Sequence, residues 1–313
     1  MTASVLVARA PTRLDFGGGW TDVPPFPEER GGFVCNVAID RYATVTLAPA
    51  GDVDTMPALA AASIRRAGVT GMSAAIASDF PVGAGLGGSS AAGVAMAAAL
   101  AALRGESPHP TVLAEWSRAV EVEELGIAGG RQDHYAAAFG GALGLTFGRE
   151  TSVEQIPLPS GTVNVLERCC ILAYTGESRI SAATITAVLD GYVAREQRVV
   201  DALDRMKSLA LEMRDALQGG DVDSLAALVD EHWAHQRSLH PGISTSRIDA
   251  LEAAARAAGA TGMKALGASG GGCVIVFADD DRVDDVRGAV EEFATVMEWG
   301  VAREGVTVEQ TEG

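Results

Sequence analysis

The sequence predicts an α+β protein built from two lobes. The chain has 313 residues, which is long for one domain and comfortable for two. Strand-like and helix-like segments follow one another without the regular alternation that a parallel βαβ sheet requires. Residues 149–165 are polar and rich in turn-forming residues, so we expect a boundary there, with domains over residues 1–160 and 161–313.

The first half is expected to combine short apolar strands with helices. Val5–Ala8 is typical of a buried strand, and residues 10–25, rich in Gly and Pro, are typical of a loop. Pro110 and Thr111 form a helix start signal. The complete set of further expected elements is strands at 33–39, 42–47 and 140–147, and helices at 56–67, 91–103 and 110–125.

The second half is expected to be mainly helical. A helical pattern covers residues 181–217 and stops at Gly219-Gly220, and Ser246 followed by Asp249 resembles a capping box that opens a helix. The other expected elements are helices at 222–239, 246–258 and 282–296, a strand at 169–174, and a glycine-rich loop from Ala265 that leads into a strand ending at Phe277.

Composition and charge exclude several classes of partner. The net charge is −17 and there is no basic stripe, which argues against nucleic-acid and anionic-membrane partners. No apolar run reaches the ~18 residues of a membrane helix, and Met1–Ala10 has no secretory signal. The four cysteines show no C-x-x-C spacing, which favours reduced thiols. We expect a cytoplasmic protein, a monomer or homodimer, whose partners are small molecules.

The segment Pro81–Ala92 is the strongest candidate for a ligand site. It contains four glycines and two serines and runs into an alanine-rich segment, with Ser89 or Ser90 where an N-cap belongs. Free N–H groups at such a helix start bind phosphate. No Lys follows the glycines, so this is not a Walker loop. A dinucleotide fingerprint is disfavoured as well, because residues 74–80 make a poor buried strand.

Five charged residues are candidates for chemistry around that loop. Arg13, Asp15 and Asp22 share the first loop, where Arg suits phosphate and Asp suits sugar hydroxyls, although such charges also hold turns. Glu121 lies near a helix C-terminus, where a bound cation would offset the dipole; the alternative is a solvated acidic patch. Asp133 follows two glycines, and a pairing with Arg13 or Arg131 would keep it ionised as a base.

The spacing of two histidines and the position of one tryptophan also bear on function. His232 and His235 are spaced for a metal site, but a surface pair is favoured because no third ligand stands nearby. Trp20 lies within the polar first loop and is placed to stack on a ring.

Three motifs occur in a specific order: Arg13 followed by Gly17-Gly-Gly-Trp-Thr-Asp22, then Gly-Leu-Gly-Gly-Ser-Ser-Ala91, then Gly267-Ala-Ser-Gly-Gly-Gly272. This ordered trio resembles the GHMP kinase superfamily over the whole chain. The resemblance implies a ribosomal-S5-like N-terminal domain, a ferredoxin-like C-terminal domain, and a site between them.

Further segments are similar to the sugar-1-kinase branch of that superfamily. Residues 132–141, 174–181 and 237–244 resemble D-glycero-D-manno-heptose 7-phosphate kinases, while the first loop also resembles L-fucokinases. His134 departs from the heptose kinase pattern, which carries a second Gln at that place. The identity of the sugar is therefore open.

The resemblance implies a role for each matching residue. Asp133 accepts or orients the proton of the attacking hydroxyl, and Arg13 stabilises charge on the transferred phosphoryl group. Mg²⁺ is held by Ser89 and Glu121. The ATP phosphates are held by Gly83, Gly85, Leu86, Gly87, Gly88, Ser89 and Ser90. The acceptor is bound by Asp15, Gly18, Gly19, Trp20, Asp22, Arg179, Gly270, Gly271 and Gly272.

The expected function is transfer of the γ-phosphoryl group of ATP to the anomeric hydroxyl of a sugar or sugar phosphate, with D-glycero-D-manno-heptose 7-phosphate as the favoured acceptor. That acceptor needs a cationic pocket for its distal phosphate, with Arg179, Lys264, Arg237 and Arg247 as candidates. One alternative is a kinase of a free sugar or cyclitol such as L-fucose. Another is a sugar-binding regulator without catalysis, which is disfavoured because the catalytic positions are intact. Adenine is expected near residues 40–66.

Overall fold

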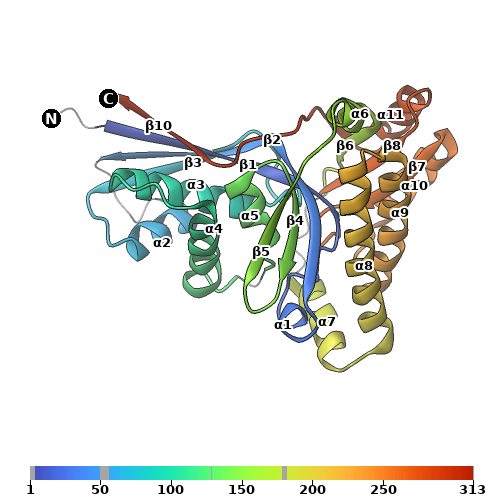
Figure 1. Ribbon diagram of the computed structural model, residues 1–313, viewed down its shortest axis with the longest axis horizontal. Helices are drawn as coiled ribbons and strands as arrows, with labels where there is room; N and C mark the ends of the chain where they lie inside the picture. Colours follow the sequence, from blue (N-terminus) through green and yellow to red (C-terminus); the bar gives the residue numbers. More distant parts are fainter. Residues whose placement is uncertain (1–3, 50–55, 128, 178–181, 313) are drawn as a thin grey trace.

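Two antiparallel sheets organise the molecule (Figure 1). The computed structural model describes residues 4–49, 56–127, 129–177 and 182–312. Within them, the first sheet has the order β10-β1-β2-β4-β5 with β3 paired to β2, and the second has the order β7-β8-β6-β9. The mixture of sheets and helices confirms the predicted α+β class.

The strands of the first sheet are β1 (Ser4–Gly17), β2 (Gly32–Pro49), β3 (Met72–Ser78), β4 (Ala142–Phe147), β5 (Thr151–Ile156) and β10 (Thr307–Glu312). Those of the second sheet are β6 (Cys170–Tyr174), β7 (Ala260–Ala265), β8 (Cys273–Ala278) and β9 (Thr295–Met297). The C-terminal strand β10 pairs with β1, so the end of the chain returns to the first sheet. A boundary near residue 160 therefore stays a proposal.

The helices of the first lobe are α1 (Phe26–Arg30), α2 (Ala58–Arg66), α3 (Gly88–Leu103), α4 (Pro110–Ala119), the π-helical turn Val120–Glu124, and α5 (Gln132–Phe139). Those of the second are α6 (Thr162–Cys169), α7 (Ala182–Val193), α8 (Gln197–Gly219), α9 (Val222–Leu239), α10 (Ser246–Ala258) and α11 (Val283–Glu291). Among the helices of these described ranges, none has the length and apolarity to cross a bilayer.

The long strands β1 and β2 serve both lobes. Their outer halves, with Ala8 and Val45, pack with the alanine-rich helix α3 in one core. Their inner halves, with Phe16 and Phe33, pack with α8 and α9 in a second core. Figure 1 shows both strands crossing from the helices α2 to α5 towards the pair α8 and α9. The boundary between the lobes is therefore spanned by continuous strands, which hold any site there on rigid elements.

Helix α3 is buried around its whole circumference. Most of its residues are small, and Ala91, Ala95 and Ala99 have no exposed surface. A helix that is apolar all round belongs inside a core. Its N-terminus at Gly88 is thereby held firmly in place beneath the glycine-rich loop.

Several expected elements are confirmed and others were wrong. The helices expected at 222–239 and 246–258 match α9 and α10, and the strand expected at 140–147 matches β4. The expected loop 10–25 was wrong up to Gly17, because β1 continues through a β-bulge between Pro11 and Thr12. The two strands expected at 33–39 and 42–47 are one strand, β2, because it stays paired with β1 on both sides of the same bulge.

Other differences arise where pairing across the fold overrides local pattern. The turn-rich stretch 149–165 holds β5 and the start of α6, since β5 forms a hairpin with β4. The helical stretch expected at 181–217 is interrupted at Arg195, which has φ 58°. Helix α3 is capped by Gly87 rather than by Ser89 or Ser90. Strands β7 and β10 were not expected, because they are recognisable only by their partners.

Candidate active site

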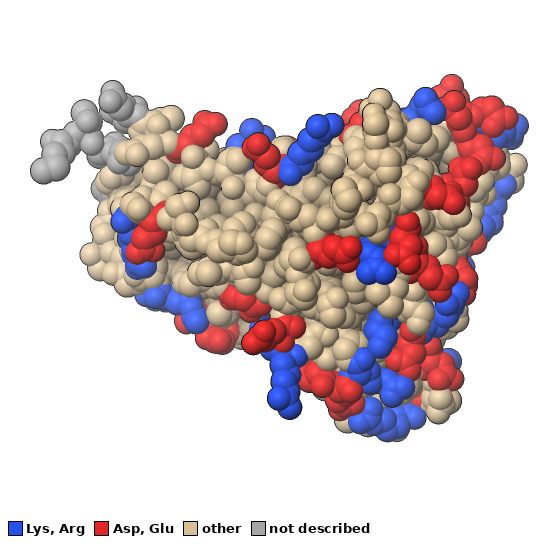
Figure 2. Space-filling model, viewed as in Figure 1, with Lys and Arg blue, Asp and Glu red and all other residues tan. Residues whose placement is uncertain are grey.

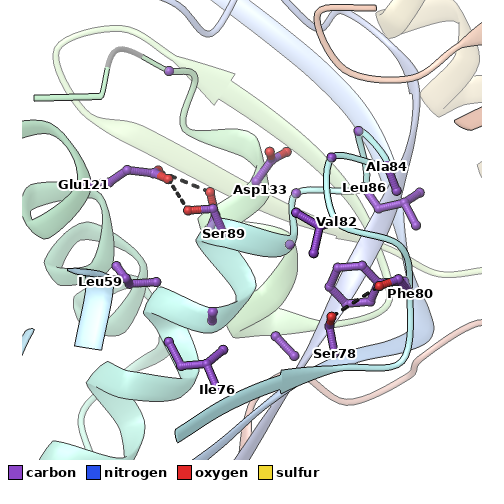
Figure 3. Close-up of a pocket in the computed structure, with 18 of the residues that line it drawn as sticks. Leu59, Ile76, Ser78, Phe80, Val82, Ala84, Leu86, Ser89, Glu121 and Asp133 are labelled. Atoms are coloured by element: carbon purple, nitrogen blue, oxygen red, sulfur yellow. Dashed lines mark hydrogen bonds between the residues drawn. The ribbon is translucent and has the colours of Figure 1, made fainter. Parts of the chain in front are cut away.

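Two adjoining cavities meet at Asp133. The larger has a volume of about 610 Å³ and extends from Leu59 and Ile76 to the glycine-rich loop (Figure 3). The smaller has a volume of about 180 Å³ and is lined by residues of the first loop and of α5. Gly129, Gly130 and Asp133 line both cavities. A ligand in each cavity would therefore meet its neighbour beside the Asp133 carboxylate.

The glycine-rich loop forms one wall of the larger cavity. Each residue from Gly83 to Ser90 lines it. Gly87 has φ 77° and a Cβ atom there would lie 2.8 Å from Cγ of Asp133, so only glycine fits. Because α3 starts without a side-chain cap, its first N–H groups are left for a ligand. This is the geometry of an anion site at a helix N-terminus.

Glu121 enters the larger cavity from a π-helical turn. Such turns are rare and often occur at functional sites. Ser89 Oγ donates to Glu121 Oε1 at 2.7 Å and Ser90 Oγ donates to Oε2 at 3.3 Å (Figure 3). Burial raises the pKa of Glu121, but His134, whose Nε2 lies 3.0 Å from Oε2, and the two hydroxyls bring it below its usual range. The group is therefore a carboxylate held beside the two serines of the glycine-rich loop.

Asp133 is held by Arg13 rather than by Arg131. Nε and Nη2 of Arg13 each lie 2.7 Å from Oδ1 of Asp133, and Nη1 donates to the carbonyl of Gly85 at 2.7 Å. Arg131 instead pairs with Glu28. The Arg13 side chain is 3% exposed, while Asp133 is 25% exposed and opens to both cavities. One guanidinium thus fixes the carboxylate and the glycine-rich loop relative to each other.

Asp22 holds the start of the helix that carries Asp133. Its Oδ2 accepts from the backbone N–H groups of Arg131 at 2.7 Å and Gln132 at 3.0 Å. Burial raises the pKa of Asp22 to about 6; the charges of Asp133 and Asp15 act in the same direction, and the two N–H groups oppose it. Asp22 lines the smaller cavity as well, so it can serve both the helix and a ligand.

We expect Asp22→Asn to gain stability relative to the wild type as the pH rises. Since the pKa of Asp22 is raised in the folded state, the carboxyl stabilises the fold at low pH, and this contribution is lost as pH rises through about 6. At about 1.4 kcal/mol per pKa unit, the difference in free energy of unfolding should change by about 3 kcal/mol between about pH 4 and about pH 7. Urea titrations across this pH range measure the free energy of unfolding, with Asp204→Asn as the exposed control. If the free energies of Asp22→Asn and of the wild type change in parallel with pH, the expectation is contradicted.

The remaining first-loop residues divide between the cavity and its support. Asp15, Gly19 and Trp20 line the smaller cavity. Gly18 does not line it; its N–H donates to Nε2 of His232 at 2.9 Å. His232 is fully buried, so the expected surface pair with His235 was wrong. Burial, together with the charge of Lys264, lowers the pKa of His232 well below its usual value, which makes it a neutral anchor for the loop.

The third glycine motif packs behind the glycine-rich loop that ends at Ser90. Gly267 and Ala268 line the smaller cavity, whereas Gly270 to Gly272 are absent from the linings of both cavities. The N–H groups of Gly270 and Gly272 donate to the carbonyls of Ile243 and Glu177. The N–H of Cys273 donates to the carbonyl of Ala84 at 2.7 Å. The structure thus brings Gly270 to Gly272 against the glycine-rich loop that ends at Ser90 rather than into the cavities.

The candidates for a distal-phosphate pocket are not gathered at the smaller cavity. Lys264 is fully buried and pairs with Asp15. Arg237 pairs with Asp249 and Glu252, and Arg247 donates to the carbonyl of Phe293 at 2.7 Å. Arg179 lies outside the described residues. Lys264, Arg237 and Arg247 line neither cavity, and the partner of Lys264, Asp15, is itself part of the lining of the smaller one.

Sequence reasoning missed several residues that line the cavities. Gln132, Val23 and Ile185 belong to the smaller cavity. Ile76 and Phe80 belong to the larger one, beside Ala43, Pro57 and Leu59 from the region where adenine was expected. Val23 and Gln132 stand in segments that carry the family resemblance, but Ile185, Ile76 and Phe80 stand in no motif. Only the position of Gln132, directly before Asp133, could have drawn attention to it.

Figure 2 shows acidic and basic side chains intermixed over the second lobe, with no broad basic area on this face of the described chain. Many of them form exposed ion pairs, as between Arg30 and Asp204. This distribution gives no support to a nucleic-acid partner.

Comparisons with known proteins agree with this geometry. Residues 56–141 match the family model of the GHMP kinases N terminal domain, and residues 213–295 match that of the GHMP kinases C terminal domain. A D-glycero-alpha-D-manno-heptose 7-phosphate kinase of Campylobacter jejuni is 26% identical over 95% of this chain and 97% of its own. A bifunctional fucokinase/GDP-fucose pyrophosphorylase of Arabidopsis thaliana is 25% identical over 93% of this chain, which spans about a third (32%) of that protein.

Solved structures share the fold. A D-glycero-D-manno-heptose 1-phosphate kinase from Bacteroides thetaiotaomicron superposes with a TM-score of 0.81 at 23% identity, covering 98% of this chain and 100% of its own. A Lactococcus lactis galactokinase complexed with galactose gives 0.75 at 17% identity, covering 97% and 95%. With both family domains matched over more than half of its length, the chain belongs to the GHMP kinases, a family of phosphotransferases.

Proposed function

We propose that this protein transfers the γ-phosphoryl group of ATP to the anomeric hydroxyl of a sugar or sugar phosphate. The observation that carries the proposal is the position of Asp133, at the junction of a glycine-walled cavity and a small cavity rich in carboxylates. Phosphoryl transfer needs an acceptor oxygen placed in line with a phosphate and groups that neutralise charge. Two cavities that meet at one carboxylate suit that requirement.

The larger cavity suits a nucleoside triphosphate. Its far end is apolar, with Leu59, Ile76 and Phe80, and is suited to a purine ring. Its near end is the cradle at Gly87 and Gly88, where a Cβ atom would collide with Asp133 or with the ring of Phe80. Backbone N–H groups there suit the phosphates.

The donors beside the cradle fit Mg²⁺. Among the described residues, no group of three or more His, Cys, Asp or Glu could hold a metal by itself. Ser89 and Glu121 offer one hydroxyl and one carboxylate at the phosphate end, and Mg²⁺ is commonly bound by one or two carboxylates together with substrate phosphates. When bound, Mg²⁺ neutralises phosphate charge during transfer.

Asp133 and Arg13 supply the remaining chemistry in this proposal. Asp133 lies where an acceptor hydroxyl would approach the nucleotide, and its carboxylate takes or orients the hydroxyl proton. Arg13 keeps the carboxylate in place through two contacts of 2.7 Å and adds positive charge where the phosphoryl group passes. A catalytically silent regulator has no need of this arrangement.

Two acceptor classes remain as candidates. The likeness to the Campylobacter jejuni heptose 7-phosphate kinase favours D-glycero-D-manno-heptose 7-phosphate. The charge of the smaller cavity favours a free sugar or cyclitol, because Asp15, Asp22 and Asp133 line it. Arg13, the one cation among its described lining residues, is already paired with Asp133. A second phosphate would require a further cation, for which Arg179 stays the candidate.

ADP release with ATP, measured against free sugars, sugar phosphates and cyclitols with and without Mg²⁺, tests the proposal. Phosphorus NMR of the product locates the new phosphate. Turnover of a 7-phosphoheptose, with loss of affinity for that substrate alone in Arg179→Ala, supports the first acceptor. Turnover of L-fucose or another unphosphorylated acceptor supports the second. ATP binding without turnover of any acceptor overturns the proposal and favours a sugar-binding regulator.

A further inference from the structure

One buried ion pair joins the two lobes directly beneath the smaller cavity. Lys264, on β7 of the second sheet, places Nζ 3.1 Å from Oδ2 of Asp15, on β1 of the first sheet. The same ammonium donates to the backbone carbonyl of Asp15 at 2.8 Å. Lys264 is 0% exposed and the Asp15 side chain 3%. Desolvating such a pair is costly, and a hydrophobic pair of similar volume is often as stable, so stability alone is a weak reason for its presence.

The pair leaves one oxygen of the carboxylate unused. Oδ1 of Asp15 is buried and has no hydrogen-bond partner among the described residues. A buried acceptor without a donor costs about 1–3 kcal/mol, so such a group in a native protein calls for an explanation, and a partner from outside the protein is one. Asp15 lines the smaller cavity beside Gly19 and Asp133, so the missing donor is expected from a ligand there.

The surroundings keep Asp15 in its acceptor-only form. Burial raises the pKa of Asp15, but the charges of Lys264 and Arg13 and the bond from Lys264 hold it below its usual value. An ionised carboxylate offers only acceptors, which suits a hydroxyl donor and repels a phosphate. Trp20 also lines the smaller cavity, and its buried Nε1 donor lacks a partner among the described residues. A hydroxyl group can both donate and accept, so these two atoms together suit a polyol.

We propose that Asp15 is a specificity-determining residue that accepts a hydrogen bond from a hydroxyl of the acceptor, and that Lys264 is the positioning residue that holds it from the second lobe. The inference rests on the proposed function and deepens it. Lys264 thereby contributes to acceptor recognition without itself lining the smaller cavity, through its two bonds to Asp15. The lobes must keep their relative position for this oxygen to meet a substrate.

Three variants separate recognition from stability: Asp15→Asn, Lys264→Met, and the two combined. Each single change leaves one buried group without its counter-charge, so both should lower the melting temperature. The combination removes both charges and should recover most of that loss. Its KM for the acceptor should nevertheless stay raised by about 10- to 100-fold, the value of one hydrogen bond to a charged group, while its KM for ATP stays at the wild-type value.

The acceptor used is the sugar that the wild-type protein phosphorylates in the ADP-release assay. The matched control combines Arg30→Met with Asp204→Asn. These two residues form an exposed ion pair, with 2.6 Å between Nη2 and Oδ2, and neither lines a cavity. Recovery of both melting temperature and acceptor KM in the combined variant overturns the inference, because the pair is then structural only. If the combined variant does not fold, Asp15→Asn decides the matter: an unchanged acceptor KM overturns the inference and a raised one, with KM for ATP unchanged, supports it. Absence of turnover in the wild type is a failure of the proposed function instead.

Discussion

Asp133→Asn is expected to lower kcat by about 10²- to 10⁴-fold, the range that general base catalysis contributes. The amide keeps the size of the side chain but cannot take the hydroxyl proton. Nucleotide affinity should be retained, because the glycine-rich loop from Gly83 to Ser90 offers mainly backbone groups to the larger cavity. The measurement is kcat and KM for both substrates, together with ATP binding by calorimetry.

The variant should fold, but with reduced stability. Asp133 is the second residue of α5 and 25% exposed, and its replacement also takes the counter-charge from Arg13, which is 3% exposed, so the melting temperature should fall. Asp204→Asn, an exposed residue of α8, is the matched control and should have wild-type kinetics. Wild-type turnover in Asp133→Asn would remove this residue from the mechanism and leave Arg13 and the phosphate loop to account for catalysis.

Arg13→Lys is expected to reduce kcat on the order of 10³-fold, within the range of arginine residues that stabilise phosphoryl transfer. Lysine keeps the positive charge, but a single ammonium cannot reproduce the planar fork that contacts both Asp133 and the carbonyl of Gly85. The carboxylate and the phosphate loop would then move independently. Steady-state kinetics with ATP and the identified acceptor measures the effect.

The same change tests whether the role of Arg13 is positional. If it is, KM for the acceptor and kcat should change together while the melting temperature falls by only a few degrees, since a donor to Gly85 remains possible. Arg30→Lys, which also faces a carboxylate but on the surface, serves as control and should change neither. A large fall in melting temperature with a wild-type kcat for the folded fraction would show that Arg13 is structural.

Much of the site could be predicted because glycine and charge carry local information. The segment from Gly83 to Ser90 is identifiable since consecutive glycines before a helix serve few purposes, and the structure places all of it in the larger cavity. Asp133 could be identified from its place after Gly129-Gly130, although its partner was left open between Arg13 and Arg131. Sequence separation gives no distance, so the choice of Arg13 required the fold.

Other expectations failed where one side chain has several possible partners. Lys264 had the chemistry of a phosphate ligand, yet it lies buried against Asp15, a residue 249 positions away. His232 looked like half of a surface pair and is a buried anchor for Gly18. Strand β10 has no pattern of its own and exists through its pairing with β1. In each case the stabilising free energy comes from a contact between segments far apart in the sequence. Composition and periodicity do not report such contacts.

The sequence by itself determined the α+β class, the glycine-rich loop before a helix, and the presence of a carboxylate and a cation suited to phosphoryl transfer. Each of these depends on the conformational freedom of glycine or on the charge of a side chain, which are properties of single residues and their neighbours. Tertiary structure alone decided that two cavities meet at Asp133, that Arg13 and not Arg131 holds it, and that a lysine of the second lobe sits behind Asp15. The physical reason is that ion pairs and cavities depend on distances of a few ångströms between segments whose relative positions only the packed cores establish.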